Sequence, residues 1–293
     1  MPGGFTSHMR AELEALGFRP SRRLGQNFMR DGNMLAALAR ASRAGAGDLV
    51  LEPGPGAGGL TAELLALGCA VVAVEIDPLL AGFLRERFGA EPRLSLLEGD
   101  VLAGGRTLSP VALSALGGRP FRVCSNLPYS AGTPFLVALA ASDLPWRSAA
   151  VTVQREVAER LSAPPGDAQY GAVTVLMAVR ARCRLERRVP PEVFWPRPRV
   201  DSAVLCLEPL ERPAVSAAEF GPFAAFVRGL FSFRRKRLER ALVSAGLAPE
   251  AARAAAAAAG AREGDRPEHV SPAGFAAAWR SVPANPAPGA GEG

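Results

Sequence analysis

The cluster Asn126-Leu127-Pro128-Tyr129 carries the clearest chemical signal in the chain, and it directly follows the apolar run of residues 121–125. At the end of a strand, such a cluster brings a side-chain amide, backbone carbonyls and an aromatic face into one small pocket. A flat heterocycle with an exocyclic amino group fits there, because its ring can stack on Tyr129 while its N–H groups donate to the Asn126 side-chain oxygen. Asn and Pro are also ordinary turn residues, so a plain turn after a buried strand explains the same four residues.

A glycine-rich segment lies upstream of this cluster. The apolar run at residues 49–51 leads through Glu52 into Gly54-Pro55-Gly56-Ala57-Gly58, and leucines at helical spacing follow. Glycines let the backbone approach a ligand closely and turn tightly into a helix, so the segment predicts the start of a βαβ unit. A lone glycine pattern of this kind also fits dinucleotide binding.

Two further apolar runs, at residues 70–76 and 94–97, are each accompanied by an acidic residue near the carboxyl end of the expected strand. Glu75 lies about 20 residues after the glycines, where ribose hydroxyls are held in such folds. Asp100 closes the next run. In open α/β sheets the ligand sits outside the carboxyl ends of the strands, so these signals should meet at one edge. An NAD-binding oxidoreductase would explain the glycines and Glu75, but not the Asn-Leu-Pro-Tyr cluster after the fourth strand.

The ordered set resembles the S-adenosylmethionine-dependent methyltransferases that modify exocyclic amino groups of nucleic-acid bases. Further segments are similar to the ribosomal RNA adenine N6,N6-dimethyltransferase family: residues 22–31, 154–161, 170–171, 194–204 and 231–238. The matches are closest to the branch that acts on the small-subunit (16S) rRNA. The alternative is the erythromycin-resistance branch, which dimethylates large-subunit rRNA. That branch often has Ile in place of Leu127 and usually lacks a block like Arg234-Arg235-Lys236, so both features favour the small-subunit branch.

The resemblance implies dimethylation of adenines, two adjacent ones near the 3′ end of 16S rRNA, with S-adenosylmethionine as methyl donor. It assigns catalysis to Asn126, with Leu127 or Pro128 supplying a carbonyl that accepts the second amino hydrogen. Tyr129 and Phe194 would stack on the target base, although Phe194 could instead be a core aromatic. A ribosome assembly factor that keeps the fold without catalysis is a further alternative.

The resemblance also assigns residues to the cofactor and to RNA, and no metal is required. The residues expected to contact S-adenosylmethionine are Gln26, Asn27, Met29, Gly54, Gly56, Glu75, Asp100 and Asn126. The block Arg234-Arg235-Lys236-Arg237 is expected to contact the RNA backbone, with a solvated helix face as the alternative interpretation. A net charge of +6 and a pI of about 9.9 suit a polyanionic partner, here the small ribosomal subunit and its 16S rRNA.

Composition bounds the remaining properties of the chain. With 293 residues and 48% hydrophobic content, it is long enough for one large domain and a small second one. The four scattered cysteines form no Cys-x-x-Cys pair, which indicates free thiols in a reducing compartment. Without a signal-peptide pattern or an apolar run of about 18 residues, we expect a cytoplasmic monomer that does not enter membranes.

The alternation of apolar runs and helical patterns predicts a doubly wound, mostly parallel α/β sheet of Rossmann-like type, followed by a small helical domain. Strands are expected at residues 151–154, 173–179 and 203–207, and a helix at 156–161. We expect four regions: a flexible lead at 1–20 with a short helix around 9–16, a methyltransferase domain at 21–208, a helical RNA-binding domain at 209–283 and a disordered tail at 284–293.

Overall fold

The computed structural model describes residues 7–21 and 23–282. The chain divides into two compact units, each discussed by itself. The first comprises Met1–Ser162 with Arg182–Pro209, and the second comprises Ala163–Ala181 with Leu210–Gly293. The predicted tail at 284–293 lies outside the described residues.

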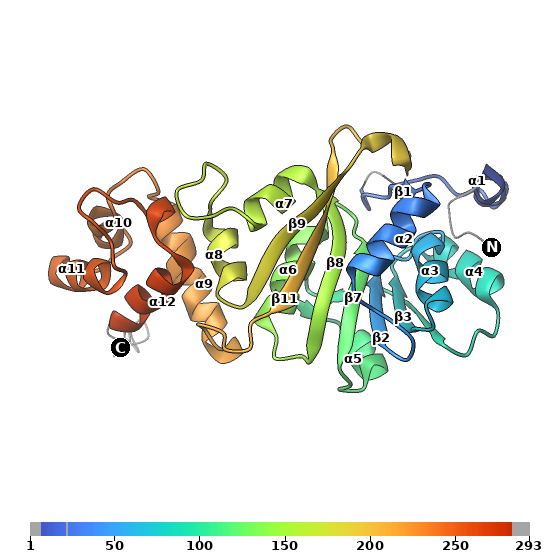
Figure 1. The fold of residues 1–293 in the computed structure, drawn as a ribbon, viewed down its shortest axis with the longest axis horizontal. Helices are drawn as coiled ribbons and strands as arrows, with labels where there is room; N and C mark the ends of the chain where they lie inside the picture. Colours follow the sequence, from blue (N-terminus) through green and yellow to red (C-terminus); the bar gives the residue numbers. More distant parts are fainter. Residues whose placement is uncertain (1–6, 22, 283–293) are drawn as a thin grey trace, which may run out of the picture. The chain divides into compact units, whose positions relative to one another are not determined.

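A seven-stranded sheet forms the centre of the first unit (Figure 1), in the order β4-β3-β2-β7-β8-β11-β9. The strands are β2 (Leu49–Pro53), β3 (Ala70–Glu75), β4 (Leu94–Glu98), β7 (Phe121–Asn126), β8 (Trp146–Gln154), β9 (Ala181–Val189) and β11 (Ser202–Pro209). The first five in sheet order are parallel, and β11 runs antiparallel to β8. The predicted α/β class with a mostly parallel sheet is confirmed.

Because neighbouring strands are parallel, the carboxyl ends of β2, β3, β4 and β7 lie at one edge of the sheet. In register, Leu51 of β2 pairs with Val72 of β3 on one side and Val123 of β7 on the other. Glu75 pairs with Glu98 at the end of β4. The short segments that follow these strands therefore meet at this edge, as the pattern of glycine loop, acids and Asn-Leu-Pro-Tyr predicts.

Helices and short strands complete the first unit: α1 (Ser7–Ala15), β1 (Phe28–Met29), α2 (Gly32–Ala41), α3 (Gly59–Ala66), α4 (Pro78–Phe88), β5 (Leu102–Ala103), β6 (Thr107–Leu108), α5 (Pro110–Leu116), α6 (Gly132–Ala141), α7 (Arg155–Leu161), the 3₁₀ turn η1 (Pro191–Val193) and β10 (Phe194–Trp195). Leucines of α2 and α3, with Leu38 and Leu64 fully buried, pack on Val50 and Cys124 of the sheet. Helical spacing of these leucines places one apolar face of each helix on the strands, which fixes the start of α3 beside the glycine loop.

The predicted flexible lead at 1–20 needs correction over its described part. Leu13 of α1 and the following Phe18 are buried in a cluster that includes Phe28, and the rings of Phe18 and Phe28 make an edge contact with centroids 5.8 Å apart. Residues 7–18 therefore carry a packed helix and a buried aromatic. Burial of these apolar side chains supplies the free energy that orders the segment.

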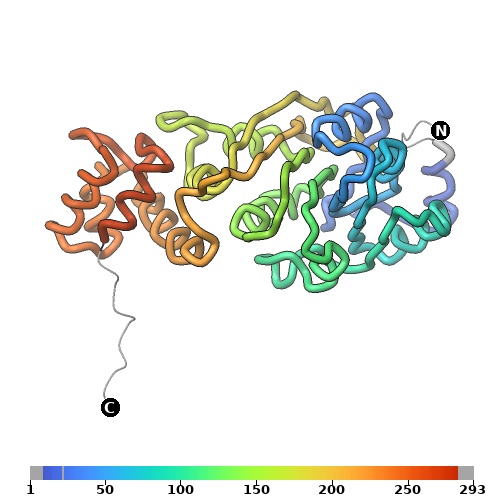
Figure 2. Tube along the Cα trace, turned by 60° about the horizontal axis from the view of Figure 1, so that its bottom comes forward, coloured from blue at the N-terminus to red at the C-terminus, as the bar shows by residue number. Residues whose placement is uncertain are grey.

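The second unit is helical: α8 (Ala172–Ala178), α9 (Ala217–Phe231), α10 (Leu238–Ser244), α11 (Pro249–Ala258), the 3₁₀ turn η2 (Pro267–His269) and α12 (Pro272–Ser281). Figure 2 shows the Cα trace of this unit, with α9–α12 in orange to red and the earlier stretch at 163–181 in yellow-green. The Tyr170 hydroxyl donates to the Val270 carbonyl at 2.8 Å, and the Phe231 and Phe275 rings stack with centroids 5.6 Å apart. This core ties residues 163–181 to helices at the end of the chain.

The strand expected at 173–179 is wrong, because those residues form α8. A short run of valines, leucine and methionine is equally typical of a buried strand and of a buried helix. Val175 and Met177 are both buried in α8, so burial alone does not distinguish the two. The expectation of one contiguous domain at 21–208 shares this error, because α8 belongs to the helical unit, where it packs against α9 and α12. None of the helices within residues 7–21 and 23–282 combines the length and apolar character of a membrane span.

Candidate active site

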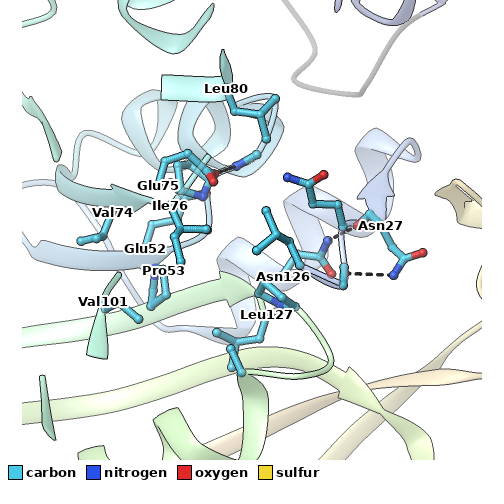
Figure 3. A pocket seen from close by; sticks show the side chains of 18 of the residues that line it. Asn27, Glu52, Pro53, Val74, Glu75, Ile76, Leu80, Val101, Asn126 and Leu127 are labelled. Atoms are coloured by element: carbon cyan, nitrogen blue, oxygen red, sulfur yellow. Dashed lines mark hydrogen bonds between the residues drawn. The ribbon is translucent and has the colours of Figure 1, made fainter. Parts of the chain in front are cut away.

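A cavity of about 320 Å³ opens at the carboxyl edge of the sheet (Figure 3). Its walls come from the ends of β2, β3 and β7, from the segment after β4 and from the segment that precedes β1. The structure brings all eight residues expected at the cofactor to this cavity: Gln26, Asn27, Met29, Gly54, Gly56, Glu75, Asp100 and Asn126. Leu127 and Pro128 also line it. The four sequence signals thus converge on one site.

The glycine loop forms the floor of the cavity, and two of its glycines adopt backbone conformations that side chains resist. Gly54 and Gly56 have φ of 65° and 59°. A Cβ on Gly56 would lie 3.0 Å from the Phe28 ring, and one on Gly54 would lie 3.4 Å from Pro128. A side chain at either position would fill the cavity wall and strain the backbone. The loop therefore keeps bare backbone facing the ligand.

Glu75 is held rigidly at the end of β3, with 3% of its surface exposed. One carboxylate oxygen accepts from the Gly56 amide and the other from the Asp77 amide, both at 2.9 Å. Burial raises the pKa of Glu75, while these two amide donors counteract the rise. The carboxylate thus links the glycine loop to β3 at the place where the sequence predicts a ribose contact.

A second buried acid, Glu52, lies at the end of β2 with 1% of its surface exposed. Its Oε2 accepts the Thr61 hydroxyl at 2.7 Å. Burial raises the pKa of Glu52 from 4.5 to about 8, and the nearby Glu75 adds to the rise, while the Thr61 hydroxyl opposes it. From the sequence, Glu52 is expected to orient the loop or the methionine amino group of the cofactor rather than to take part in the chemistry.

The carboxyl groups of the cavity wall favour a cationic ligand, because a nearby cation stabilises their ionised forms. Glu52, Glu75 and Asp100 line it, whereas Arg23 is the only basic residue among the described residues of its wall. A dinucleotide carries a pyrophosphate that would face these carboxyl groups with little compensation. S-adenosylmethionine carries a sulfonium and an ammonium group, so its charge is complementary to the wall.

The segment before β1 is fastened over the cavity by hydrogen bonds at several points. Gln26 donates to Asp77 at 2.8 Å and accepts from the Ser21 amide at 2.7 Å. Asn27 donates its side-chain amide to the Gly25 carbonyl at 3.1 Å. Met29 pairs with Phe194 in the two-stranded β1–β10 sheet. Both polar ends of the Gln26 side chain therefore have protein partners, and the residue holds this segment in place.

Asn126 at the end of β7 is oriented by the same segment. Its Nδ2 donates to the Asn27 carbonyl at 2.8 Å (Figure 3). This hydrogen bond fixes the orientation of the Asn126 amide, so Oδ1 is the atom that can accept a hydrogen bond from a ligand. No described residue donates to Oδ1. The Pro128 carbonyl accepts from the Ala131 and Gly132 amides at 3.0 and 3.1 Å.

The Leu127 and Pro128 carbonyls differ in their backbone hydrogen bonds. No described residue donates to the Leu127 carbonyl, whereas the Pro128 carbonyl is occupied by the turn that opens α6. The sequence prediction left Leu127 and Pro128 as alternatives. Of these two carbonyls, the one that lacks a donor among the described residues is that of Leu127.

The two aromatic residues expected to stack on a base lie in different surroundings. Tyr129 is half-buried, and its hydroxyl lies 2.6 Å from the Ser202 hydroxyl. Phe194 is 2% exposed and packs in the core with Met29 and Val189, so the structure does not bring its ring to the cavity. Pairing of β10 with β1 buries the ring, which agrees with the alternative of a core aromatic.

Ser202 is a polar residue of this region that sequence reasoning matched within a motif but did not single out. The one indication in the sequence is that Ser202 lies in the family-like segment of residues 194–204. Serine is too common in strands for its partner to be inferred without the antiparallel pairing of β11 with β8.

The basic block lies in the second unit, between α9 and α10. Arg235, Lys236 and Arg237 line a surface groove of about 990 Å³ together with Arg240, Arg253 and Arg266. Arg234 pairs with Glu268 at 3.2 Å, and Lys236 donates to the Ser244 hydroxyl at 2.8 Å. Most of these cations face the groove, which favours an anionic partner over a merely solvated helix face.

Comparison with known proteins places this geometry in context. A family model described as ribosomal RNA adenine dimethylase matches residues 17–274. A protein of Phenylobacterium zucineum named "Ribosomal RNA small subunit methyltransferase A" is 40% identical over 96% of this chain and 96% of its own length. One of the same name from Anaeromyxobacter dehalogenans is 41% identical over 93% of this chain and 97% of its own.

Two solved structures share the fold. The dimethyladenosine transferase of Plasmodium falciparum superposes with a TM-score of 0.67 at 22% identity, over 85% of this chain and 95% of its own. The 23S rRNA methyltransferase ErmE superposes with a TM-score of 0.66 at 24% identity, over 87% of this chain and 99% of its own. At these identities the likeness shows a common fold and does not distinguish between their RNA targets.

Proposed function

The chain belongs to the ribosomal RNA adenine dimethylase family, and from this premise we propose that it methylates adenine amino groups of small-subunit (16S) rRNA during ribosome biogenesis. The methyl donor is S-adenosylmethionine. The substrate is two adjacent adenines near the 3′ end of that RNA, each receiving two methyl groups. Relatives about 40% identical over nearly the whole chain carry the small-subunit name, which supports this target.

The observation that carries the proposal is the pair of acceptors at the end of β7. Asn126 Oδ1 and the Leu127 carbonyl have no donor among the described residues, while both line the cavity. An adenine amino group has two hydrogens and a nitrogen lone pair delocalised into the ring. Two acceptors bind both hydrogens, draw the lone pair out of conjugation and direct it toward the methyl donor.

The same acceptors stabilise the positive charge that develops on the nitrogen during transfer. Because Asn126 is already oriented by the Asn27 carbonyl, this stabilisation requires little reorganisation. Placing nitrogen and methyl donor in line supplies the proximity contribution. No general base is needed before transfer, because the amino group loses its proton only after it becomes cationic.

The residues around the cavity fit the cofactor. The bare loop at Gly54 and Gly56 gives backbone approach, Glu75 faces the ribose hydroxyls, and Asp100 faces the adenine amino group. Gln26, Asn27 and Met29 cover the methionine end. The acidic wall complements the cationic groups, and the sulfonium supplies the electrophilic methyl.

The target base enters beside Asn126, with Tyr129 as one stacking face. Phe194 could contribute a second face only after its ring leaves the core, so we assign the base wall to Tyr129. An adenine in a loop is unstacked at lower cost than one in a helix.

The helical unit supplies the sequence-independent part of binding. The groove at Arg235, Lys236 and Arg237 offers cations to RNA phosphates, and Arg234 flanks it. Phosphate contacts set affinity and position without reading bases. The expected setting is the cytoplasm, where the chain acts as a monomer on a ribosomal particle.

The test uses small ribosomal subunits that lack adenine dimethylation, tritiated S-adenosylmethionine and the full chain. Asn126→Ala is compared with Asn33→Ala, which removes an exposed amide from α2. We expect N6,N6-dimethyladenosine in 16S rRNA, unchanged in Asn33→Ala and reduced about 100-fold or more in Asn126→Ala.

Two other outcomes would replace the proposal. Label in naked large-subunit RNA, with none in the small subunit, would assign the chain to the erythromycin-resistance branch. Binding of the cofactor and the particle without label in either RNA would leave an assembly factor that acts without catalysis.

A further inference from the structure

A contact between the Tyr129 and Ser202 hydroxyls joins the Asn-Leu-Pro-Tyr segment to β11, the second strand from β7 in the sheet. The two oxygens lie 2.6 Å apart, across 73 residues of sequence. Ser202 is the first residue of β11 and is fully buried. It pairs with Gln154 of β8, and β8 in turn pairs with the end of β7 through Thr152 and Asn126. The serine hydroxyl is therefore attached to rigid sheet.

The backbone end of Tyr129 is also fixed. The preceding carbonyl, of Pro128, accepts from the Ala131 and Gly132 amides, which closes a tight turn around residue 129. A Cβ on Gly25 would lie 3.2 Å from the Tyr129 amide nitrogen, so the segment before β1 packs closely on this turn. The side chain is thus held at its backbone by the turn and at its hydroxyl by Ser202.

The Tyr129 ring is not part of the lining of the cofactor cavity. Pro128 and Ser130, on either side of Tyr129, line that cavity, whereas Tyr129 does not. Burial raises the pKa of the Tyr129 phenol and the Ser202 bond partly offsets the rise, so the hydroxyl stays protonated at neutral pH. The ring is therefore anchored at Ser202, outside the lining of the cofactor cavity.

We propose that Ser202 is a positioning residue, which holds the Tyr129 ring as a pre-set stacking wall for the target adenine. The inference rests on the proposed function and adds a residue to its base site. A tethered ring loses no rotational freedom when the base arrives, so binding the flipped base requires less ordering. A ring that swings freely would place the base amino group in line with the methyl donor only part of the time.

The tether makes a prediction that simple stacking does not. Tyr129→Phe keeps the aromatic face and removes only the hydroxyl, while Ser202→Ala removes the partner and keeps the ring. We expect each to lower kcat on the small-subunit particle about tenfold, equivalent to the loss of one hydrogen bond. The double variant should be no slower than either single one, because both remove the same interaction.

Binding constants separate positioning from general damage. The dissociation constant of S-adenosylmethionine should stay unchanged, because Tyr129 does not line its cavity, and KM for the particle should stay within about twofold because phosphate contacts dominate it. Ser148→Ala is the matched control. Ser148 is a buried serine of β8 whose hydroxyl donates to the Ser42 carbonyl at 2.7 Å, and this variant should retain full kcat.

The results overturn the inference in defined ways. Full activity of Tyr129→Phe together with loss in Tyr129→Ala would show that stacking needs no tether, and additive losses in the double variant would show two independent roles. Should Ser202→Ala fail to fold, Tyr129→Phe at its half-buried position carries the test alone. Wild-type protein that does not methylate the particle would refute the proposed function itself, whereas active wild type with unchanged variants would refute only the tether.

Discussion

The buried carboxyl of Glu52 should make the stability of the protein fall as pH rises, and replacing it by glutamine should remove that fall. In the folded chain burial raises the pKa of Glu52 from 4.5 to about 8. Between these values the unfolded chain gives up the proton while the folded chain keeps it. The stability that depends on protonated Glu52 is therefore fully present below pH 4.5, and it is lost as the pH rises toward 8.

The size of the effect follows from the shift. Each pH unit inside this window costs roughly 1.4 kcal/mol, so the wild type should lose about 4 kcal/mol relative to Glu52→Gln between pH 5 and pH 8. Glutamine keeps an oxygen that can accept the Thr61 hydroxyl, now bound at 2.7 Å, and cannot ionise. Titration of all other groups is common to both proteins and cancels in the difference.

The assay is urea unfolding of both proteins at half-unit steps from pH 5 to pH 9. Tryptophan fluorescence reports on both units, because Trp146 and Trp195 lie in the first and Trp279 lies in the second. Glu86→Gln, at an exposed position of α4, controls for the removal of one carboxyl. A difference between wild type and Glu52→Gln that stays constant from pH 5 to pH 8 would show that Glu52 ionises normally in the folded chain and would refute the reasoning.

Three further predictions concern the same edge of the sheet. Because an ionised Glu52 attracts a cation, affinity for S-adenosylmethionine should rise with pH up to about 8, and binding should release a proton from Glu52. Calorimetry in two buffers of different ionisation enthalpy measures both the affinity and the proton release. A wild-type affinity that does not change with pH, or a pH dependence that persists in Glu52→Gln, would contradict this prediction. Thr152→Val should stabilise the chain by about 1 kcal/mol, because no described residue makes a hydrogen bond to the buried Thr152 hydroxyl. A lower midpoint of urea unfolding in the variant would contradict this prediction. Gly56→Ala should weaken cofactor binding at least tenfold, because its Cβ would lie 3.0 Å from the Phe28 ring in a backbone with φ of 59°. Equilibrium dialysis measures the dissociation constant of the cofactor, and Gly221→Ala, at an open position of α9, is the control.

The cofactor edge could be predicted from sequence because its signals are local. Gly56, Glu75 and Asp100 each follow a recognisable apolar strand, and parallel strands bring their carboxyl ends to one edge without further information. The orientation of Asn126 could not be predicted in this way. It depends on a hydrogen bond to Asn27, 99 residues away, and no local pattern specifies that distance.

The errors came from residues whose environment is set by distant parts of the chain. The apolar run at 173–179 suits a strand or a helix, and as α8 it packs against α9 and α12, which lie far along the chain. Phe194 follows a motif, but pairing of β10 with β1 determines that its ring is buried. In both cases the partner, rather than the residue, decides the outcome.

The helical unit is built from two separate stretches of chain, and this restricts how the protein can be divided. Ending the polypeptide at Pro209 would delete α9 and α12 but leave α8 behind, stripping the cover from apolar side chains such as Val175 and depriving the Tyr170 hydroxyl of its Val270 acceptor. During synthesis, too, residues 163–181 leave the ribosome well before their packing partners exist. A catalytic fragment without the helical unit must therefore omit both stretches and join Ser162 to Arg182 through a linker.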